Sequence, residues 1–238
     1  MYKITKRIFD IVFASICLVI LSPLFLVIIM ILKFTGEHEV FFRQKRIGYM
    51  GEPFMILKFA TMLKNSPNMG TKEITLRNDP RVTKVGRYLR ITKLNELPQI
   101  INVILGDMSI VGPRPLMEIS YKLYAPEVAK IIYSSRPGIT GIGSIYFRDE
   151  EKIVSQAKDP KAAYRAIFKY KAKLELWYKK NASWPTDIKI ILLTALALVI
   201  SDKNIAEKLF SNLPSKTEDT RPEIKEHLLE PVFAENTN

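Results

Sequence analysis

The feature that most constrains this chain is an unbroken apolar run near its N-terminus. No formally charged residue occurs between Ile11 and Leu32. A helix of about 20 apolar residues crosses the roughly 30 Å hydrocarbon layer of a bilayer. The run lacks the shorter core and small-residue cleavage site of a signal peptide, and its length disfavours a simple core helix. We therefore predict a membrane anchor over residues 1–35, with the lipid bilayer as a partner.

Two features shape the predicted anchor. Pro23, which follows Ser22 at the midpoint of the run, removes one backbone hydrogen bond and clashes with the carbonyl group four residues earlier. Basic residues flank the run on both sides, so the positive-inside rule gives a spanning helix no preferred direction. We favour a re-entrant helix that enters the bilayer, breaks at Ser22-Pro23 and returns to the same face, over a spanning helix. The freed carbonyl group then needs a partner, and the Ser22 hydroxyl is the local candidate.

Charge and composition narrow the function classes. The net charge is +12, although the C-terminal residues 215–238 are acidic, so the body of the chain is strongly basic. Such a body favours nucleic acid, anionic membrane surfaces or phosphorylated substrates as partners. We exclude nucleic acid because no nucleic-acid-binding motif accompanies the charge. The only cysteine is Cys17, which excludes internal disulfides and cysteine metal sites, and both histidines lie away from every cluster below.

The segments after the anchor predict an α+β fold that is mostly helical. Residues 39–44 and 54–59 are rich in β-branched and aromatic residues, and glycines and a proline lie between them, which predicts a small β-hairpin. We assign 36–213 to a helical domain that follows the anchor. Within it, the apolar stretch at about 187–200 is too short to span and suits an interfacial helix or, alternatively, a core helix. The polar tail at 214–238 is predicted to be disordered.

The most informative stretch runs from Arg90 to Pro115. Apolar residues recur at helical spacing through Leu97, Ile100, Ile101, Ile104 and Leu105. Asn95 is placed as the N-cap of this helix, Pro98 in its first turn, and Gly106 as its stop.

Charged residues gather at the two ends of that predicted helix. Glu96 and Arg90 lie near its N-terminus, where unpaired N–H groups favour phosphate, and Asp107 and Arg114 follow its C-terminus. Carboxylates that hold a divalent cation beside arginines that grip phosphate indicate phosphoryl chemistry. The alternative is a capped core helix with surface charges. Arg136 begins a glycine-rich turn that suits a phosphate or nucleotide, although such a turn is weak support when taken alone.

Short motifs in a fixed order run through most of the chain. They are Lys6-Arg7-Ile8-Phe9-Asp10, Ser22-Pro23, Phe42-Arg43-Gln44, Lys58-Phe59 with Thr61-Met62, Glu96-Leu97-Pro98-Gln99, Asn102-Val103, Gly106-Asp107-Met108-Ser109, Val111-Gly112-Pro113-Arg114-Pro115 and Arg136-Pro137-Gly138-Ile139-Thr140-Gly141. Over roughly residues 2–200 the sequence resembles the bacterial sugar transferases, the monotopic polyprenyl-phosphate phosphoglycosyl transferases.

The resemblance implies transfer of a sugar-1-phosphate from a UDP-sugar to undecaprenyl phosphate, with release of UMP, as the first step of lipid-linked glycan or exopolysaccharide assembly. It places the protein on the cytoplasmic face of the bacterial inner membrane. In the family an Asp-Glu pair opens the central helix, its aspartate attacks phosphorus, and Mg²⁺ is bound nearby. By position Glu96 is the glutamate of the pair and the implied Mg²⁺ ligand. The implied substrate-binding residues are Arg90, Arg114, Arg136, Lys58 and Asp107.

The chain departs from the family pattern at two positions. The family aspartate is Asn95 here, and an amide is a far poorer nucleophile than a carboxylate. Ala60 stands where the family usually has a basic residue. The first hypothesis is an active transferase in which Glu96 attacks, or in which Mg²⁺ aligns donor and acceptor for direct displacement. The alternative is a protein that binds nucleotide-sugar or lipid phosphate without turnover, as a partner of other glycan-assembly enzymes.

Overall fold

The computed structural model describes residues 2–66, 79–148, 150–158, 160–199, 205–210 and 212–214. Its elements are α1 (Tyr2–Phe34), β1 (Phe41–Ile47), η1 (Tyr49–Gly51), β2 (Pro53–Phe59), α2 (Lys84–Ile91), η3 (Leu94–Glu96), α3 (Gln99–Leu105), β3 (Ser109–Val111), α4 (Glu118–Tyr121), α5 (Pro126–Ile132), β4 (Gly138–Thr140), α6 (Ile142–Tyr146), α7 (Glu150–Gln156), α8 (Pro160–Asn181), α9 (Trp184–Val199) and α10 (Ile205–Leu209). The predicted α+β, mostly helical class is confirmed. The predicted tail lies, beyond Pro214, outside the described residues.

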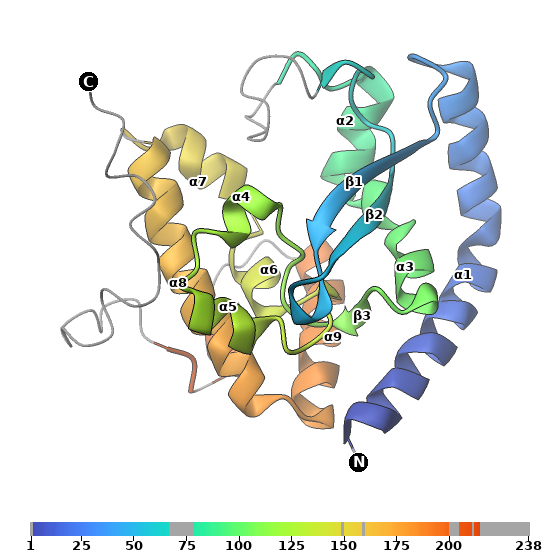
Figure 1. The fold of residues 1–238 in the computed structure, drawn as a ribbon. Coiled ribbons are helices and arrows are strands. Elements are labelled where there is room, and N and C mark those ends of the chain that lie inside the picture. The colour runs from blue at the N-terminus through green and yellow to red at the C-terminus, as the bar shows by residue number, and fades with distance from the viewer. Residues whose placement is uncertain are drawn as a thin grey trace.

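The N-terminal apolar run forms one long helix that lies along the flank of the domain (Figure 1). Within the described residues it is the one helix long and apolar enough to cross a membrane, by length and composition. The helix continues through Pro23, so the predicted break at Ser22-Pro23 is instead a bend between two inclined halves of one ribbon. The Ser22 hydroxyl donates to the Val19 carbonyl oxygen at 2.7 Å, which satisfies the group that Pro23 leaves unpaired. The re-entrant topology itself stays a prediction.

One face of α1 packs against the domain along the whole helix. Ala14 belongs to the main core, while Phe25, Ile28 and Leu32 pack with Phe59 of β2 and with Leu89 of α2. The opposite face leaves large apolar side chains exposed, among them Ile8, Val12, Val19, Leu26 and Met30. A contiguous apolar face of this kind marks a surface for lipid or another apolar partner.

The β-hairpin is confirmed, with its first strand shifted toward the turn: β1 spans 41–47 where 39–44 was predicted, and β2 spans 53–59 where 54–59 was predicted. Strands β1 and β2 pair antiparallel from Phe41 opposite Phe59 to Ile47 opposite Pro53. The turn between them includes Met50 at φ 58° and Gly51 at φ 84°. A second, parallel pair forms between β3 and β4, two three-residue strands that the sequence analysis did not predict.

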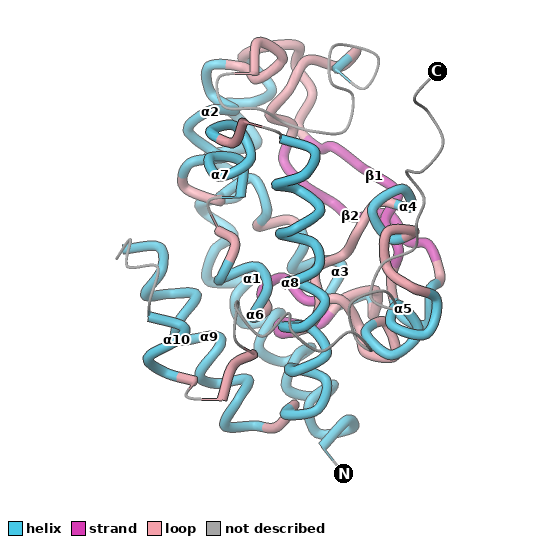
Figure 2. Tube along the Cα trace, turned by 90° about the vertical axis from the view of Figure 1, so that its left-hand side faces the viewer, coloured by secondary structure: helices cyan, strands magenta, loops and turns pink. Residues whose placement is uncertain are grey.

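The C-terminal helices enclose the rest of the core. In Figure 2, α8 separates α4 and α5 on one side from α9 and α10 on the other. Helix α9 includes residues 187–199 of the predicted stretch, and residue 200 lies outside the described residues. The helix has two faces: Ile190 and Leu193 are buried, whereas Ile188, Leu192 and Leu196 are exposed. The core-helix interpretation therefore describes the buried face, and the interfacial interpretation suits the exposed face. The interfacial placement stays a prediction.

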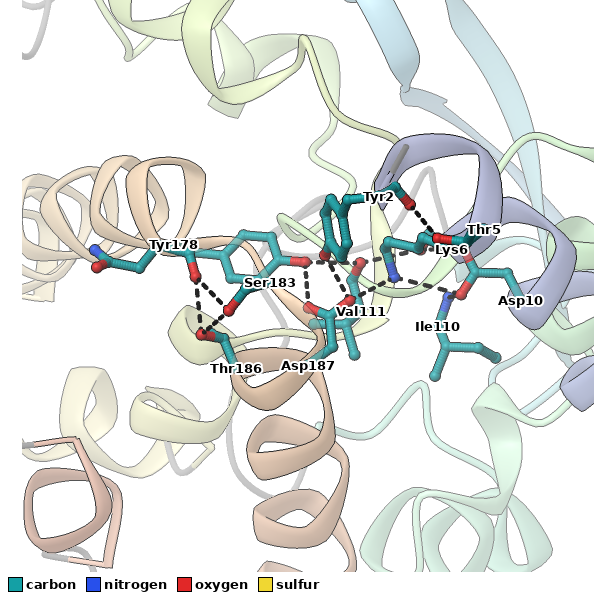
Figure 3. Close-up of polar contacts among 12 residues, drawn as sticks. Tyr2, Thr5, Lys6, Asp10, Ile110, Val111, Tyr178, Ser183, Thr186 and Asp187 are labelled. Carbon is teal, nitrogen blue, oxygen red and sulfur yellow. Dashed lines mark hydrogen bonds and ion pairs between the residues drawn. The ribbon is translucent and has the colours of Figure 1, made fainter.

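A polar cluster fastens the start of α1 to the domain (Figure 3). Lys6 lies 3.4 Å from Asp10 and 3.0 Å from Asp187 of α9, and both carboxylates are buried. The hydroxyl groups of Tyr2 and Tyr178 also donate to Asp187, at 2.7 and 2.8 Å. These ion pairs and hydrogen bonds offset the free-energy cost of burying two carboxylates.

The same end of α1 holds the segments that lead into the candidate site. Asp10 accepts hydrogen bonds from the Ser109 hydroxyl at 2.6 Å and from the Ile110 N–H at 3.2 Å. Arg7 donates to the carbonyl oxygens of Val103 and Ile104, which lie in the last turn of α3. Helix α1 thus fixes both α3 and strand β3.

Candidate active site

A small cavity lies where the β-hairpin, the η3 turn and the segment after β3 meet. Its lining residues are Arg46, Ile56, Lys58, Glu96, Gln99, Arg114, Pro115, Gly138 and Ile139. The cavity therefore brings together three of the residues predicted from the sequence, Lys58, Glu96 and Arg114. It also adds Arg46, one of the basic residues that follow the apolar run in the sequence and a residue that was not predicted for the site.

The hairpin register explains why two cations reach this cavity. Gln44 lies directly opposite Ile56, and Arg46 and Lys58 each follow by two residues on their own strands. Because side chains alternate between the faces of a sheet, these four residues share one face. That two-residue spacing is the pattern by which Arg46 could have been recognised from the sequence.

Lys58 and Glu96 form the central contact of the site. Lys58 Nζ donates to Glu96 Oε1 at 2.8 Å, and both side chains are largely buried. Burial by itself raises the pKa of Glu96, but the charges of Lys58, Arg114 and Lys93 outweigh it and hold that pKa well below its usual range. Glu96 is therefore an ionised carboxylate at any physiological pH.

Arg46 and Arg114 complete a positively charged wall. Arg46 is held by Gln44, whose Oε1 accepts from Nε at 3.1 Å and from Nη2 at 2.5 Å, and by the Pro115 carbonyl oxygen. Burial and then the nearby charge of Arg114 lower the pKa of Arg46 to about 10. Likewise burial, with Arg114 and Arg46, lowers the pKa of Lys58 despite the opposing charge of Glu96. Three cations thus surround one carboxylate, an arrangement suited to an anionic ligand.

Asn95 does not act as the predicted helix cap. Lys93, at φ 60°, precedes the 3₁₀ turn of η3, and α3 begins only after Pro98, with no side-chain cap. Because Pro98 has no N–H, the turn closes instead through bonds from Glu96 to Lys93 and from Leu97 to Leu94. Asn95 is buried and its Oδ1 has no hydrogen-bond partner within the described residues.

The rest of the predicted helix agrees in part with the structure. Gly106 ends it at φ 105°, as predicted. Ile100 is buried and Leu97 and Ile104 pack against the core, but Leu105 is 72% exposed, so the predicted apolar stripe ends one residue early.

Three other predicted residues lie away from the cavity. Asp107 accepts a hydrogen bond from Asn102 at 3.1 Å, and the Arg136 Nε donates to the Gly106 carbonyl oxygen at 2.8 Å. Both lie at the C-terminal end of α3, opposite the end that carries Glu96. The hydrogen bond from the Arg81 side chain lowers the pKa of Asp79, and the charge of Arg90 on α2 adds a smaller effect in the same direction. The substrate contacts of these three residues stay predictions.

Comparison with known proteins identifies the family of this chain. A family model described as "Bacterial sugar transferase" matches residues 1–201. The chain belongs to the bacterial sugar transferase family. It is 37% identical over 213 residues to an exopolysaccharide production protein of Rhizobium meliloti, covering 82% of this chain and 86% of the relative.

A second relative carries a more specific name. A UDP-glucose:undecaprenyl-phosphate glucose-1-phosphate transferase of Caulobacter vibrioides is 34% identical over 202 residues, covering 83% of this chain and 70% of the relative. The corresponding protein of Escherichia coli is 36% identical over 195 residues, but the match covers 39% of it. The family thus includes proteins named as sugar-phosphate transferases.

Proposed function

We propose that the chain transfers a sugar-1-phosphate from a UDP-sugar to undecaprenyl phosphate at the cavity of Arg46, Lys58, Glu96 and Arg114, with release of UMP. The observation that carries this proposal is the convergence of three cations on one ionised carboxylate. The diphosphate of a nucleotide-sugar is the complementary ligand for such a wall, since guanidinium groups bind phosphate oxygens in pairs. The names of the relatives from Caulobacter vibrioides and Escherichia coli support the same donor and acceptor classes.

The roles of the residues follow from their charge and position. Arg46, Lys58 and Arg114 neutralise the charge on the diphosphate while the bond to UMP breaks. Either an oxygen of Glu96 attacks the phosphorus bonded to the sugar, UMP leaves, and undecaprenyl phosphate then displaces Glu96, or undecaprenyl phosphate displaces UMP directly. The amide of Asn95 supplies no comparable nucleophile.

Mg²⁺ fits this site as an ion whose coordination shell is completed by oxygens of the substrate. The described residues include no group of three or more metal-binding side chains. However, Glu96 is an ionised carboxylate, and the amide oxygen of the neighbouring Asn95 has no partner among the residues that the structure describes. Mg²⁺ commonly takes one or two protein oxygens together with phosphate and water. Glu96 would hold the ion, which supplies charge neutralisation at the phosphates.

A direct assay tests the proposal. Purified protein with Mg²⁺, undecaprenyl phosphate and a panel of UDP-sugars should release UMP, and Glu96→Gln should abolish the release. Glu118→Gln, the same substitution on an exposed carboxylate, is the matched control and should leave the rate unchanged. A sugar-phosphate adduct detected by intact mass would assign the covalent route to Glu96.

The asparagine at position 95, where the family has an aspartate, favours a second candidate function. In it the chain binds nucleotide-sugar or lipid phosphate without turnover and serves as a partner of other glycan-assembly enzymes. Its signature is donor binding without UMP release for any sugar of the panel. That result would overturn the transferase proposal and leave the family membership intact.

A further inference from the structure

A buried amide on α3 pairs with the open edge of the β-hairpin. Asn102 is 3% exposed, its Oδ1 accepts from the Leu57 N–H at 2.9 Å, and its Nδ2 donates to the Met55 carbonyl oxygen at 2.8 Å. The hairpin sheet has two strands, so this edge of β2 has no partner strand within the described residues. A primary amide carries both an acceptor and donors, so one side chain can bond both groups of the edge. Asn102 therefore occupies the place of a neighbouring strand.

Asp107 fixes the orientation of this amide. Asn102 Nδ2 also donates to Asp107 Oδ2, at 3.1 Å. Because an ionised carboxylate accepts hydrogen bonds and donates none, it selects the orientation in which Nδ2 faces Asp107 and Oδ1 is left for the Leu57 N–H. The main-chain oxygen of Asn102 accepts from the N–H groups of Gly106, Asp107 and Met108 at 3.1, 3.0 and 3.2 Å, which keeps residue 107 beside the amide.

The pairing of this amide with β2 bears on the position of Lys58. Lys58 is the next residue of β2 after the N–H that Asn102 binds. Glu96 lies in η3, which continues into α3 through the hydrogen bond from the Ile100 N–H to the Leu97 carbonyl oxygen at 3.0 Å. Strand β2 and the η3–α3 segment therefore meet at two points, the Asn102 amide and the 2.8 Å contact between Lys58 Nζ and Glu96 Oε1.

We propose that Asn102 is the positioning residue of Lys58: its amide, oriented by Asp107, holds β2 where the Lys58 ammonium group reaches both Glu96 and the diphosphate. This inference rests on the proposed function, which assigns Lys58 to the diphosphate. Asn102 does not line the cavity, so its effect on the ligand passes through Lys58.

Binding of UDP to the full chain, measured by isothermal titration, tests the role of Asp107. Asp107→Ala removes the acceptor that orients the amide and should weaken UDP binding by about tenfold. Asp107→Asn removes the same negative charge but keeps an oxygen that accepts from Asn102 Nδ2, so it should bind UDP at least about threefold more tightly than Asp107→Ala. Equal losses in the two variants would show that Asp107 acts through its charge, and would overturn its role as the partner of Asn102.

A combination of Asn102→Ala with Lys58→Met tests the positioning itself. Alone, Asn102→Ala should weaken UDP binding by about tenfold. Lys58→Met has no ammonium group to position, while Arg46 and Arg114 remain to bind the diphosphate. In that background Asn102→Ala should change UDP affinity by less than about twofold, because the two substitutions act through one interaction. A general disturbance of the cavity would weaken binding in both backgrounds, since it would also displace the two arginines.

Two further variants keep this comparison decisive. Asn181→Ala is the matched control, because it removes another amide hydrogen bond, from Asn181 Nδ2 to the Trp177 carbonyl oxygen at 2.8 Å, at a residue that does not line the cavity. It should leave UDP affinity unchanged. If Asn102→Ala does not fold, Asp107→Ala takes its place beside Lys58→Met, since it leaves both bonds between Asn102 and β2 possible.

The outcomes separate the two proposals. A native protein that fails to bind UDP contradicts the proposed function. A native protein that binds UDP, with the same loss from Asn102→Ala in the native and Lys58→Met backgrounds, overturns the positioning role alone. An Asn102→Ala variant that binds UDP as tightly as the native protein overturns that role as well.

Discussion

At the scale of single residues, Asn95 has the most direct consequence for chemistry. Its amide oxygen is buried without a hydrogen-bond partner in the described part of the chain, and the next residue is the ionised Glu96. Replacement by aspartate restores the residue that the family resemblance implies as nucleophile, but it also buries a second negative charge. We predict that Asn95→Asp raises the rate of UMP release by about tenfold or more. An unchanged rate would show that residue 95 takes no part in the reaction.

The same substitution should change stability in a metal-dependent way. Without Mg²⁺, the added buried charge should cost about 2 kcal/mol and lower the melting temperature by roughly 4–8 °C. Mg²⁺ should raise the melting temperature of Asn95→Asp by more than it raises that of the native protein, because the ion binds the folded state. Equal Mg²⁺ effects on both proteins would contradict a metal site at residues 95 and 96.

Arg46 permits a second residue-scale prediction. Its planar guanidinium is fixed by Gln44 and by the Pro115 carbonyl oxygen, a geometry that lysine cannot reproduce. Arg46→Ala should weaken UDP-sugar binding by about tenfold to a hundredfold, and Arg46→Lys should recover only part of it. Arg43→Ala is the matched control, because Arg43 is exposed on the other face of the same strand. Isothermal titration measures the UDP-sugar affinity of all three variants. Equal losses of affinity in Arg46→Ala and Arg43→Ala would show that Arg46 does not bind the ligand.

At the scale of elements, the contact between α1 and the domain depends on buried charge. Asp10 pairs with Lys6 and holds Ser109 and Ile110 at the start of β3. Breaking a buried pair costs about 3–5 kcal/mol, so Asp10→Asn should lower the melting temperature by roughly 10 °C. Glu118→Gln breaks an exposed pair with Lys122 and should lower it by less than about 2 °C. Similar shifts for both variants would mean that the α1 cluster adds little stability.

The sequence predicted the elements that depend on local patterns and missed those that depend on distant contacts. The hairpin follows from two runs of β-branched and aromatic residues around a glycine-containing turn. The end of α3 follows from Gly106, which adopts the left-handed backbone that glycine favours. The β3–β4 pair consists of two three-residue strands that are far apart in the sequence, so no local pattern predicts it. The start of α3 lies later than predicted. Asn95 was expected to cap the helix, whereas the residues before Pro98 form a 3₁₀ turn.

The candidate site shows the same division. Glu96 and Arg114 lie in recognisable motifs, and the cavity contains both. Arg46 was missed because a basic residue after an apolar run is typical of a membrane flank.

At the scale of the whole molecule, the contacts of α1 bear on how it meets the membrane. Its first half is tied to β3, α3 and α9 through Lys6, Arg7 and Asp10, and its second half packs against β2 and α2 through Phe25 and Leu32. A helix that crosses the bilayer would carry one of these halves away from the domain it contacts. We therefore predict that both ends of α1 lie on the same side of the membrane as the domain.

Cysteine labelling in sealed membrane vesicles tests this topology. In a Cys17→Ser background, Lys3→Cys and Lys33→Cys place single thiols near the two ends of α1, where both native side chains are exposed, and Glu118→Cys marks the domain. An impermeant maleimide should label all three positions from one side, because each half of α1 remains in contact with the same domain. Labelling of Lys3→Cys and Lys33→Cys from opposite sides would establish a spanning helix. It would also require one half of α1 to leave the contacts described here.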